Sequence, residues 1–274
     1  MKTILVPTDF SSAAANAARY AADFANSINA EKIILYNAYA MPIATEMTWA
    51  LMESEQLKQA SQSGLDALKM VLRPFCDPAI AIETMADFGF FSQRINDASE
   101  EMHVDIVIMG ITGSGGLERV FFGSSALTAV HNTKLPLLIV PPEATWHGVD
   151  KIAWACDFHN VQETTPLHII HDLLELTKAQ LHVLHSNNHV KDFDPEMVQE
   201  NIYLHKFFKD KPFEFALLTE ADLSEAISKY VFENGIDWLI VVPKKHSWLH
   251  HLFTKNHTKE LAFHTHVPML CLQQ

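Results

Sequence analysis

Three glycines and a serine, in the pattern Gly110-x2-Gly113-x9-Gly123-Ser124, form the segment of this 274-residue chain best suited to chemistry. Glycine lets the backbone approach an anion closely because no Cβ intervenes, and the last two residues of the pattern stand where a helix would begin. The first turn of a helix offers unpaired N–H groups and a dipole that favours negative charge. The pattern predicts a phosphate-binding loop; the alternative is an ordinary glycine-rich connection between a strand and a helix.

The same segment lacks the groups that transfer phosphoryl groups. It contains no Gly-x4-Gly-Lys-Ser/Thr motif, no lysine lies between Gly110 and Ser125, and Arg119 is its only cation. Glu118 stands where a dinucleotide fingerprint would need its third glycine. Without a fixed lysine or an evident base for water, turnover lacks its usual parts. We therefore expect no catalytic residues and ATP binding without efficient turnover, with slow ATP hydrolysis or phosphotransfer as the enzymatic alternative.

Strands and helices alternate on both sides of the glycine pattern. Apolar runs predict strands at 3–6, 32–36, 79–83, 105–109 and 135–140. Amphipathic or alanine-rich segments predict helices at 13–29, 47–72, 91–102 and 125–132. Short apolar strands separated by helices indicate an α/β fold whose parallel sheet is covered on both faces.

The second half of the chain repeats the first. The opening segment that ends in Asp9-Phe10 has a counterpart that ends in Asp157-Phe158. The later strand-like segments recur in the same order, 33–36 as 181–184, 105–110 as 237–243 and 134–139 as 266–271. A match between two short apolar strands means little, but shared order and spacing across the chain indicate a duplication. The sequence predicts two domains, 1–143 and 149–274.

These features resemble the universal stress protein family in its tandem, two-domain form. Two motifs of the first domain are the most specific, the segment 6–11 (Val-Pro-Thr-Asp-Phe-Ser) and the glycine pattern, which is similar to the nucleotide-binding signature of ATP-binding members. The resemblance implies two tandem doubly wound parallel five-stranded sheets, each in the order 3-2-1-4-5, of the adenine nucleotide alpha hydrolase-like fold. It also implies an intrachain pseudo-dimer through the fifth strands, 135–140 and 267–272, with a homodimer as a further option.

Ligands of open α/β sheets bind beyond the carboxyl ends of the strands, where the strand order reverses. There the resemblance implies ATP or a related adenine nucleotide, with magnesium on its phosphate oxygens. The resemblance implies contacts of the base and ribose with Pro7, Thr8 and Asp9, of the adenine edge with Ala38, of the ribose with Met109 and Gly110, and of the phosphates with Gly113, Gly123, Ser124 and Ser125. The position of Asp9 alone also fits an N-cap of the following helix.

The second domain departs from the glycine pattern. Pro243 and His246 stand opposite the first two glycines, and Lys255 or Asn256 stands opposite the third. Side chains at these positions, and a proline without an N–H, would prevent close approach of the backbone to a polyphosphate. We expect the second domain to be degenerate, mainly structural and unable to bind ATP in the manner of the first.

Histidines are concentrated in the second domain. Only His103 and His131 of the 16 histidines precede the junction, which leaves 14 after it. His246 and His250 have the i, i+4 spacing of zinc ligands on a helix, but the spacing fixes no third ligand. A solvated histidine-rich surface is therefore favoured over a zinc site. A metal-responsive or protein-interaction module built on the histidine-rich second half is the third functional hypothesis.

Composition limits the class of partner and compartment. A formal net charge of −13 argues against nucleic acid and anionic membranes as general partners. No apolar stretch reaches the roughly 20 residues of a membrane-spanning helix, and no secretion signal is visible. Three widely spaced cysteines suit a reducing compartment. We expect a cytoplasmic stress-response protein with a regulatory or protective role, whose protein partners and sensed stress the sequence does not identify.

Overall fold

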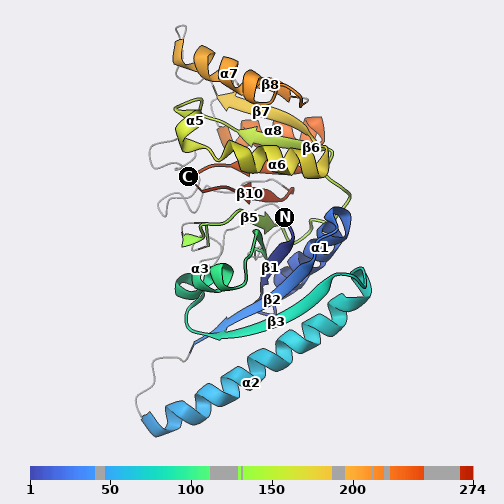
Figure 1. Cartoon of the computed structure of the whole chain (residues 1–274), viewed down its shortest axis with the longest axis vertical. Coiled ribbons are helices and arrows are strands. Elements are labelled where there is room, and N and C mark those ends of the chain that lie inside the picture. The colour runs from blue at the N-terminus through green and yellow to red at the C-terminus, as the bar shows by residue number, and fades with distance from the viewer. Residues whose placement is uncertain are drawn as a thin grey trace. The chain divides into compact units, whose positions relative to one another are not determined.

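The computed structural model describes residues 1–40, 47–111, 129–130, 132–186, 195–211, 213–218, 223–243 and 266–273, and the side chains of 47–53, 186 and 195–196 are not considered. The described residues fall into two compact units. Unit 1 contains those up to Trp146 and unit 2 those from His147 onward. Figure 1 labels the helices and strands of each unit.

Unit 1 is a parallel sheet of five strands with helices on both faces (Figure 1). Its elements are β1 (Thr3–Pro7), α1 (Ser12–Ile28), β2 (Lys32–Tyr39), α2 (Met47–Leu72), the 3-10 turn η1 (Arg73–Phe75), β3 (Ala81–Phe88), α3 (Phe91–Glu101), β4 (Ile106–Gly110) and β5 (Leu137–Val140). The strand order is β3-β2-β1-β4-β5, and each neighbouring pair is parallel. The order reverses between β1 and β4, as the sequence resemblance implied.

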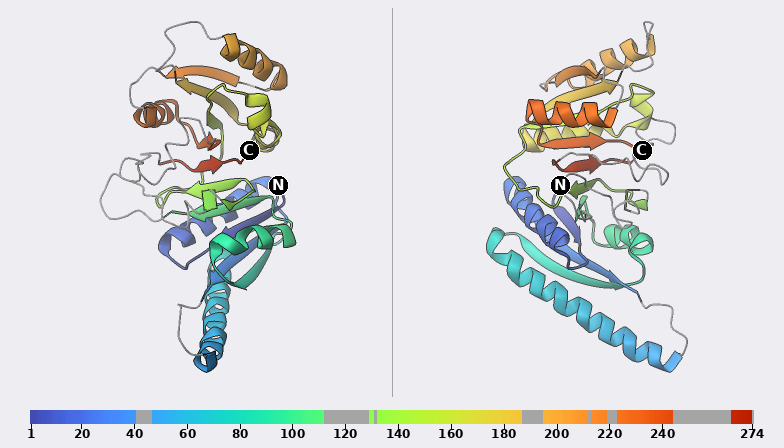
Figure 2. Two further views of the ribbon diagram at one scale, coloured as in Figure 1. Left: turned by 90° about the vertical axis from the view of Figure 1, so that its left-hand side faces the viewer. Right: turned by 180° about the vertical axis from the view of Figure 1, so that it is seen from behind.

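Burial explains the apolar runs of unit 1. The central strands are covered on both faces, and Ile4, Leu5, Val6 and Ile106 to Ile108 have no exposed surface. Helix α1 buries a face made largely of alanines, so its backbone lies close to the sheet. Helices α1 and α2 cover one face and α3 lies on the other, as the two views of Figure 2 show. Right-handed crossovers between parallel strands require this division.

Unit 2 repeats the architecture. Its elements are β6 (Lys151–Ala155), α5 (Val161–Thr164), α6 (Leu167–Thr177), β7 (Gln180–Ser186), α7 (Pro195–Phe207), β8 (Phe213–Leu218), α8 (Leu223–Asn234), β9 (Trp238–Val241) and β10 (Met269–Cys271). The strand order is β8-β7-β6-β9-β10, again with parallel neighbours. Helix α6 is in front of the sheet in Figure 1 and α8 is in front in the reverse view of Figure 2, so they cover opposite faces.

One aspartate in each unit ties the start of the first strand to the start of the fourth. Asp105 Oδ2 accepts hydrogen bonds from the N–H groups of Lys2 (2.6 Å) and Thr3 (2.9 Å). Asp237 Oδ2 accepts from those of Asp150 (2.8 Å) and Lys151 (2.9 Å). The shared geometry makes Asp237 the equivalent of Asp105. This equivalence shows which residue of β9 corresponds to which residue of β4.

Two strands of unit 1 run well past their predicted ends, and β2, predicted at 32–36, continues to Tyr39. Strand β3 was predicted at 79–83 but runs from Ala81 to Phe88, because a half-exposed strand lacks a continuous apolar run. The helix after β6 is interrupted: Thr165 is extended and Pro166 separates α5 from α6. Proline disfavours the helical conformation of the residue before it, so unit 2 has no continuous counterpart of α1. Most of the predicted helix 125–132 lies outside the described residues.

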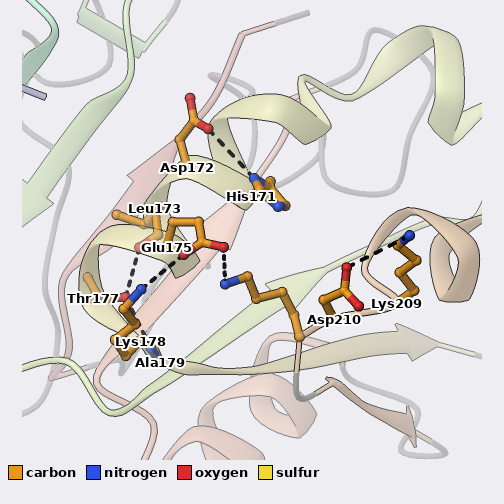
Figure 3. A network of polar contacts seen from close by, with 10 residues as sticks. His171, Asp172, Leu173, Glu175, Thr177, Lys178, Ala179, Lys209 and Asp210 are labelled. Carbon is orange, nitrogen blue, oxygen red and sulfur yellow. Dashed lines mark hydrogen bonds and ion pairs between the residues drawn. The ribbon is translucent and has the colours of Figure 1, made fainter.

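A network of ion pairs connects α6 with the segment before β8 (Figure 3). The Glu175 carboxylate is paired with Lys211 and with Lys178, whose Nζ lies at 2.9 Å. Hydrogen bonds from Lys211 and then Lys178 lower the pKa of Glu175 to about 2. Because Glu175 and Lys178 are exposed, water screens their attraction, whereas the Lys211 side chain is only 13% exposed. The network orders the surface of unit 2 rather than forming a site.

Buried His182 makes the stability of unit 2 depend on pH. Its side chain is 2% exposed, its Nδ1 lies 2.9 Å from Tyr230 Oη, and its Nε2 has no hydrogen-bond partner among the described residues. Burial lowers the pKa of His182 from 6.5; Glu214, 3.8 Å away, opposes this and Lys151 adds to it. Unfolded chains therefore bind more protons near that pH, so stability falls as the pH drops through 6.5.

We expect His182→Gln to reduce this loss. Urea unfolding at pH 7.5 and 5.5 should show a smaller difference for the variant than for the unchanged chain. His168→Gln, at an exposed histidine of α6, is the control and should keep the full difference. If the free energy of unfolding depends on pH equally in the His182 variant and the unchanged chain, His182 is not the source of the loss.

The helices of the described segments differ from membrane-spanning helices. None of them combines the length and the apolar composition that a membrane-crossing helix needs. The cysteines Cys76, Cys156 and Cys271 are all buried and none forms a disulfide.

Candidate functional site

The carboxyl ends of β1 and β4 lie side by side, at the point where the strand order reverses. Ile4 and Leu5 pair with Ile106 and Val107, and two residues further this register brings Pro7 level with Met109. Pro7 also pairs with Tyr36 of β2, two residues before Ala38. Six of the predicted site residues therefore share one edge of the sheet: Pro7, Thr8, Asp9, Ala38, Met109 and Gly110. Gly113, Gly123, Ser124 and Ser125 lie outside the described residues.

The turn after β1 is held by all the polar groups of Thr8. Its N–H donates to the Tyr36 carbonyl (2.8 Å), and its Oγ1 accepts from the Phe10 N–H (3.0 Å). Its carbonyl accepts from Asn37 Nδ2 (2.7 Å). Thr8 is 7% exposed, so these bonds are shielded from water. The turn is consequently fixed before any ligand arrives.

Asp9 follows Thr8 and is exposed. Its Oδ1 accepts from the Ser11 N–H at 3.0 Å, while its Oδ2 makes no hydrogen bond to a described residue. The N-cap of α1 is Ser11, whose Oγ accepts from the Ala14 N–H at 3.2 Å. The N-cap interpretation of Asp9 is therefore wrong. Its carboxylate instead closes a turn that precedes the helix, by accepting the N–H of the N-cap residue Ser11. One of its oxygens is free to accept a hydrogen bond from a ligand hydroxyl.

Gly110 allows the end of β4 to contact the first turn of α1. A Cβ at this position would lie 2.3 Å from the Ala13 carbonyl oxygen and 2.6 Å from the Ala13 carbonyl carbon. Both are backbone atoms of a packed helix, so neither can rotate away. The sequence connected this glycine with the ligand, whereas the geometry also gives it a packing role. The contact brings the start of α1 to the edge of the sheet that carries the turn.

Asp87, Tyr36 and Arg94, which the sequence did not indicate, form a hydrogen-bonded network at the strand pair that contains Ala38. Asp87 of β3 pairs with Ala38 and is 9% exposed. It accepts from Tyr36 Oη (3.0 Å) and from Arg94 Nε (3.0 Å). Burial, and then the Asp87 charge, raise the pKa of Tyr36 above its ordinary value. Because the sequence prediction ended β3 at residue 83, Asp87 fell in a loop and the network escaped notice.

Unit 2 keeps the turn geometry with different side chains. Cys156, the equivalent of Thr8, donates its N–H to the Leu184 carbonyl (2.8 Å), and its Sγ accepts from the Phe158 N–H (3.4 Å). Asp157 Oδ1 accepts from the His159 N–H (3.2 Å), as Asp9 does from Ser11. The turn after β6 therefore has the same pattern of hydrogen bonds as the turn after β1.

The aromatic residue after the aspartate distinguishes the two turns. Phe10 and Phe158 both have positive φ angles, 64° and 53°. Phe10 is 45% exposed, whereas Phe158 is 3% exposed and packs edge-on against His185 and Phe215, with centroid distances of 5.1 and 5.5 Å. In unit 2 the ring is thus buried against β7 and β8, whereas in unit 1 the Phe10 ring is partly exposed.

The structure corrects one residue equivalence. With Asp237 equivalent to Asp105, the counterpart of Gly110 is Val242, which is 1% exposed, and not Pro243. The apolar run 238–242 carries no mark of register, so the sequence alignment was displaced by one residue. The glycine is still absent, now replaced by a buried β-branched side chain.

The metal candidates His246 and His250 lie outside the described residues, as do Lys255 and Asn256. Within the described segments, no group of three or more His, Cys, Asp or Glu side chains is arranged to hold a metal ion.

Comparisons with known proteins identify one family. The sequence model of the universal stress protein family matches residues 1–141. Universal stress protein MJ0531 of Methanocaldococcus jannaschii is 33% identical over 142 residues, 51% of this chain and 81% of that protein. Universal stress protein Sll1654 of Synechocystis is 29% identical over 140 residues, 51% of this chain and 85% of its own length.

Two solved structures cover the entire fold. A universal stress protein of Archaeoglobus fulgidus aligns with a TM-score of 0.75 and 16% identity, over 99% of this chain and 98% of that one. A structure from Pseudomonas aeruginosa UCBPP-PA14 aligns with a TM-score of 0.62 and 17% identity, over 100% and 93%. At these identities the likeness concerns the fold alone.

Proposed function

The chain belongs to the universal stress protein family, and from this we propose that unit 1 binds ATP or a related adenine nucleotide while unit 2 does not. The fixed turn at the reversal of strand order carries the proposal. Its Thr8 uses all its polar groups internally, whereas Asp9 keeps one carboxylate oxygen available at the exposed edge. A preorganised turn loses little entropy on binding.

The individual contacts follow the sequence resemblance. Pro7, Thr8 and Asp9 contact the base and ribose, the main chain of Ala38 contacts the adenine edge, and Met109 and Gly110 face the ribose. Gly113, Gly123, Ser124 and Ser125 hold the phosphates, and magnesium is bound to the phosphate oxygens. The segment offers no lysine for phosphoryl transfer, so the nucleotide is bound and released rather than consumed. Nucleotide occupancy then regulates conformation or partner choice in a cytoplasmic stress response.

Two features of unit 2 support its exclusion from nucleotide binding. Val242 stands where unit 1 has Gly110, so unit 2 lacks the glycine that lets the first turn of α1 approach the end of β4. The later glycines of the pattern have no counterparts either, so side chains would keep the unit 2 backbone from close approach to phosphates. We therefore expect one adenine nucleotide per chain at saturation.

A matched pair of substitutions tests the assignment. Asp9→Ala and Asp157→Ala each remove a carboxylate that accepts a local N–H, at 3.0 and 3.2 Å, so the same turn bond is lost in both units. Asp9→Ala should weaken ATP binding at least about tenfold by removing a contact to the ligand. Asp157→Ala should leave affinity unchanged. Titration calorimetry of the full chain with Mg-ATP gives both the affinity and the number of sites.

The outcomes separate the parts of the proposal. A chain that takes up no adenine nucleotide overturns the function, and two equivalent sites overturn the exclusion of unit 2. If both alanine variants weaken binding equally, the site does not lie on unit 1 alone. Product formation during long incubation would favour the enzymatic alternative.

A further inference from the structure

We propose that Asn37 and Ser61 are positioning residues of the nucleotide site: Ser61 orients the Asn37 carboxamide, which holds the Thr8 carbonyl and fixes the turn carrying Thr8 and Asp9. This inference rests on the proposed function, because it names residues through which α2 controls the same site. Neither residue belongs to the turn. Asn37 lies on β2 and Ser61 lies on α2, 24 positions further along the chain.

The contacts form a continuous path from helix to turn. Ser61 Oγ lies 2.7 Å from Asn37 Oδ1, and Asn37 Nδ2 lies 2.7 Å from the Thr8 carbonyl oxygen. Ser61 is 4% exposed and Thr8 is 7% exposed. A buried carbonyl or hydroxyl that loses its partner is costly, so water does not readily replace either bond. The path is therefore short, partly buried and built from complementary groups.

Chemistry fixes the orientation of the carboxamide. The Thr8 carbonyl can only accept a hydrogen bond, so it requires the NH2 group of Asn37. The carboxamide oxygen then faces Ser61, whose hydroxyl donates to it. A flipped amide would place two oxygens against each other at 2.7 Å. Each residue of the path thus determines the orientation of the next.

Holding the Thr8 carbonyl fixes the direction in which the chain enters Asp9. The peptide group between the two residues is planar, so a fixed carbonyl oxygen also fixes the N–H on the other side. The Thr8 N–H is already bound to Tyr36 of β2. With both sides of Thr8 held by β2, the position of Asp9 follows from Asn37. Loss of the carboxamide should let this peptide group rotate and misplace the exposed carboxylate.

Unit 2 contains the same device with another side chain. His185 occupies the position of Asn37, because Leu181 pairs with Ile152 as Ile33 pairs with Ile4. Its Nδ1 lies 3.0 Å from the carbonyl oxygen of Cys156, the equivalent of Thr8. A donor to this carbonyl is therefore present in both halves of the duplication. Histidine is consequently the natural replacement with which to restore the bond in unit 1.

Asn26 provides a matched control. Like Asn37 it is an intermediate-burial asparagine of unit 1, and its side chain also bridges two groups. Its Nδ2 donates to the Phe75 carbonyl (2.8 Å) and its Oδ1 accepts from the Asp77 N–H (2.8 Å). These contacts lie near the amino ends of the strands, opposite the candidate site. Asn26→Leu should therefore reduce stability without touching the turn.

The experiment compares the unchanged full chain with four variants, each with a single substitution: Asn37→Leu, Asn37→His, Ser61→Ala and Asn26→Leu. Calorimetry with Mg-ATP measures affinity, and amide hydrogen exchange of Thr8 and Phe10 without nucleotide measures the mobility of the turn. Thermal unfolding measures the common loss of stability. Asn37→Leu should weaken ATP binding about tenfold, the equivalent of one hydrogen bond, and speed exchange by a similar factor.

The other variants define what would overturn the inference. Asn37→His should restore affinity to within about threefold of the unchanged chain, and Ser61→Ala should weaken it about threefold. Asn26→Leu should lower the melting temperature without changing affinity. Faster exchange in Asn37→Leu with undiminished affinity would overturn the inference while leaving the proposed function intact. If the unchanged chain takes up no nucleotide, the proposed function fails, and the positioning role fails with it.

Discussion

Replacing Gly110 with alanine is expected to destabilise unit 1 by about 3 kcal/mol, the upper end of the range for overpacked sites. The new Cβ would lie 2.3 Å from the carbonyl oxygen of Ala13. That atom belongs to the first turn of α1, so relief requires the helix to move away from β4. The movement would also loosen the alanine face with which α1 covers the sheet. Hydrogen exchange of the β1 and β4 amides measures the loss within this unit.

Gly64→Ala is the control for the glycine itself. A Cβ at Gly64 would lie 2.7 Å from the Phe10 ring, but that ring is 45% exposed and can turn aside. Because Gly64 lies inside α2, alanine should gain up to about 1 kcal/mol of helix propensity. The two substitutions add the same methyl group and should change stability in opposite directions. An equally mild effect at Gly110 would mean that α1 does not need this close approach.

This result bears on how ligand-site glycines are interpreted. Gly110 belongs to a pattern that the sequence connects with phosphate binding, yet its Cβ position is occupied by the protein's own backbone. Lost nucleotide binding in Gly110→Ala would therefore report a displaced helix as readily as a lost ligand contact. The Asp9 and Asp157 pair is the cleaner test, because neither substitution adds a side chain against α1 and both remove the same turn bond.

Much of the fold was predictable because its strongest signals are local. The strands β1, β2, β4 and β5 are buried apolar runs, and α2 has the bounds that its amphipathic sequence predicted, Met47–Leu72. The duplication was visible because several segments recur in the same order and spacing, and the structure makes Asp105 and Asp237 equivalent within it. These aspartates bond to the first strands across about 100 residues, and no local signal could have indicated that role.

What the sequence missed depends on contacts between distant elements. The register of the run 238–242 cannot be read from apolar residues alone, so Pro243 was assigned where Val242 belongs. Asn37 and Ser61 are unremarkable in sequence, and only the packing of α2 on the sheet makes them neighbours. The break at Pro166 has a local cause instead, since proline rarely permits a helix through the preceding residue.

Phe158→Ala is expected to destabilise unit 2 by about 3 kcal/mol, whereas Phe10→Ala should cost unit 1 less than about 1 kcal/mol. The difference follows from burial, because Phe158 is 3% exposed and Phe10 is 45% exposed. Removing the Phe158 ring leaves a cavity against His185 and Phe215. Both residues have positive φ angles, so the backbone strain is common to the pair and does not decide the comparison.

Hydrogen exchange in β1 and β6 reports the two costs separately, with each variant as the control for the other. Equal losses would contradict the different burial of the two rings. Similar losses at low temperature that diverge on heating would instead indicate a change in the unfolded chain.

The same variant separates two reasons why unit 2 should not bind a nucleotide. If the Phe158 ring alone closed the crevice, Phe158→Ala would gain a second ATP site in calorimetry. We expect the number of sites to stay at one, because Val242 remains where unit 1 has a glycine and the later glycines of the pattern have no counterparts. Close approach of the backbone to phosphates needs the absence of side chains at several positions together. Removal of the Phe158 ring alone would therefore not restore a nucleotide site.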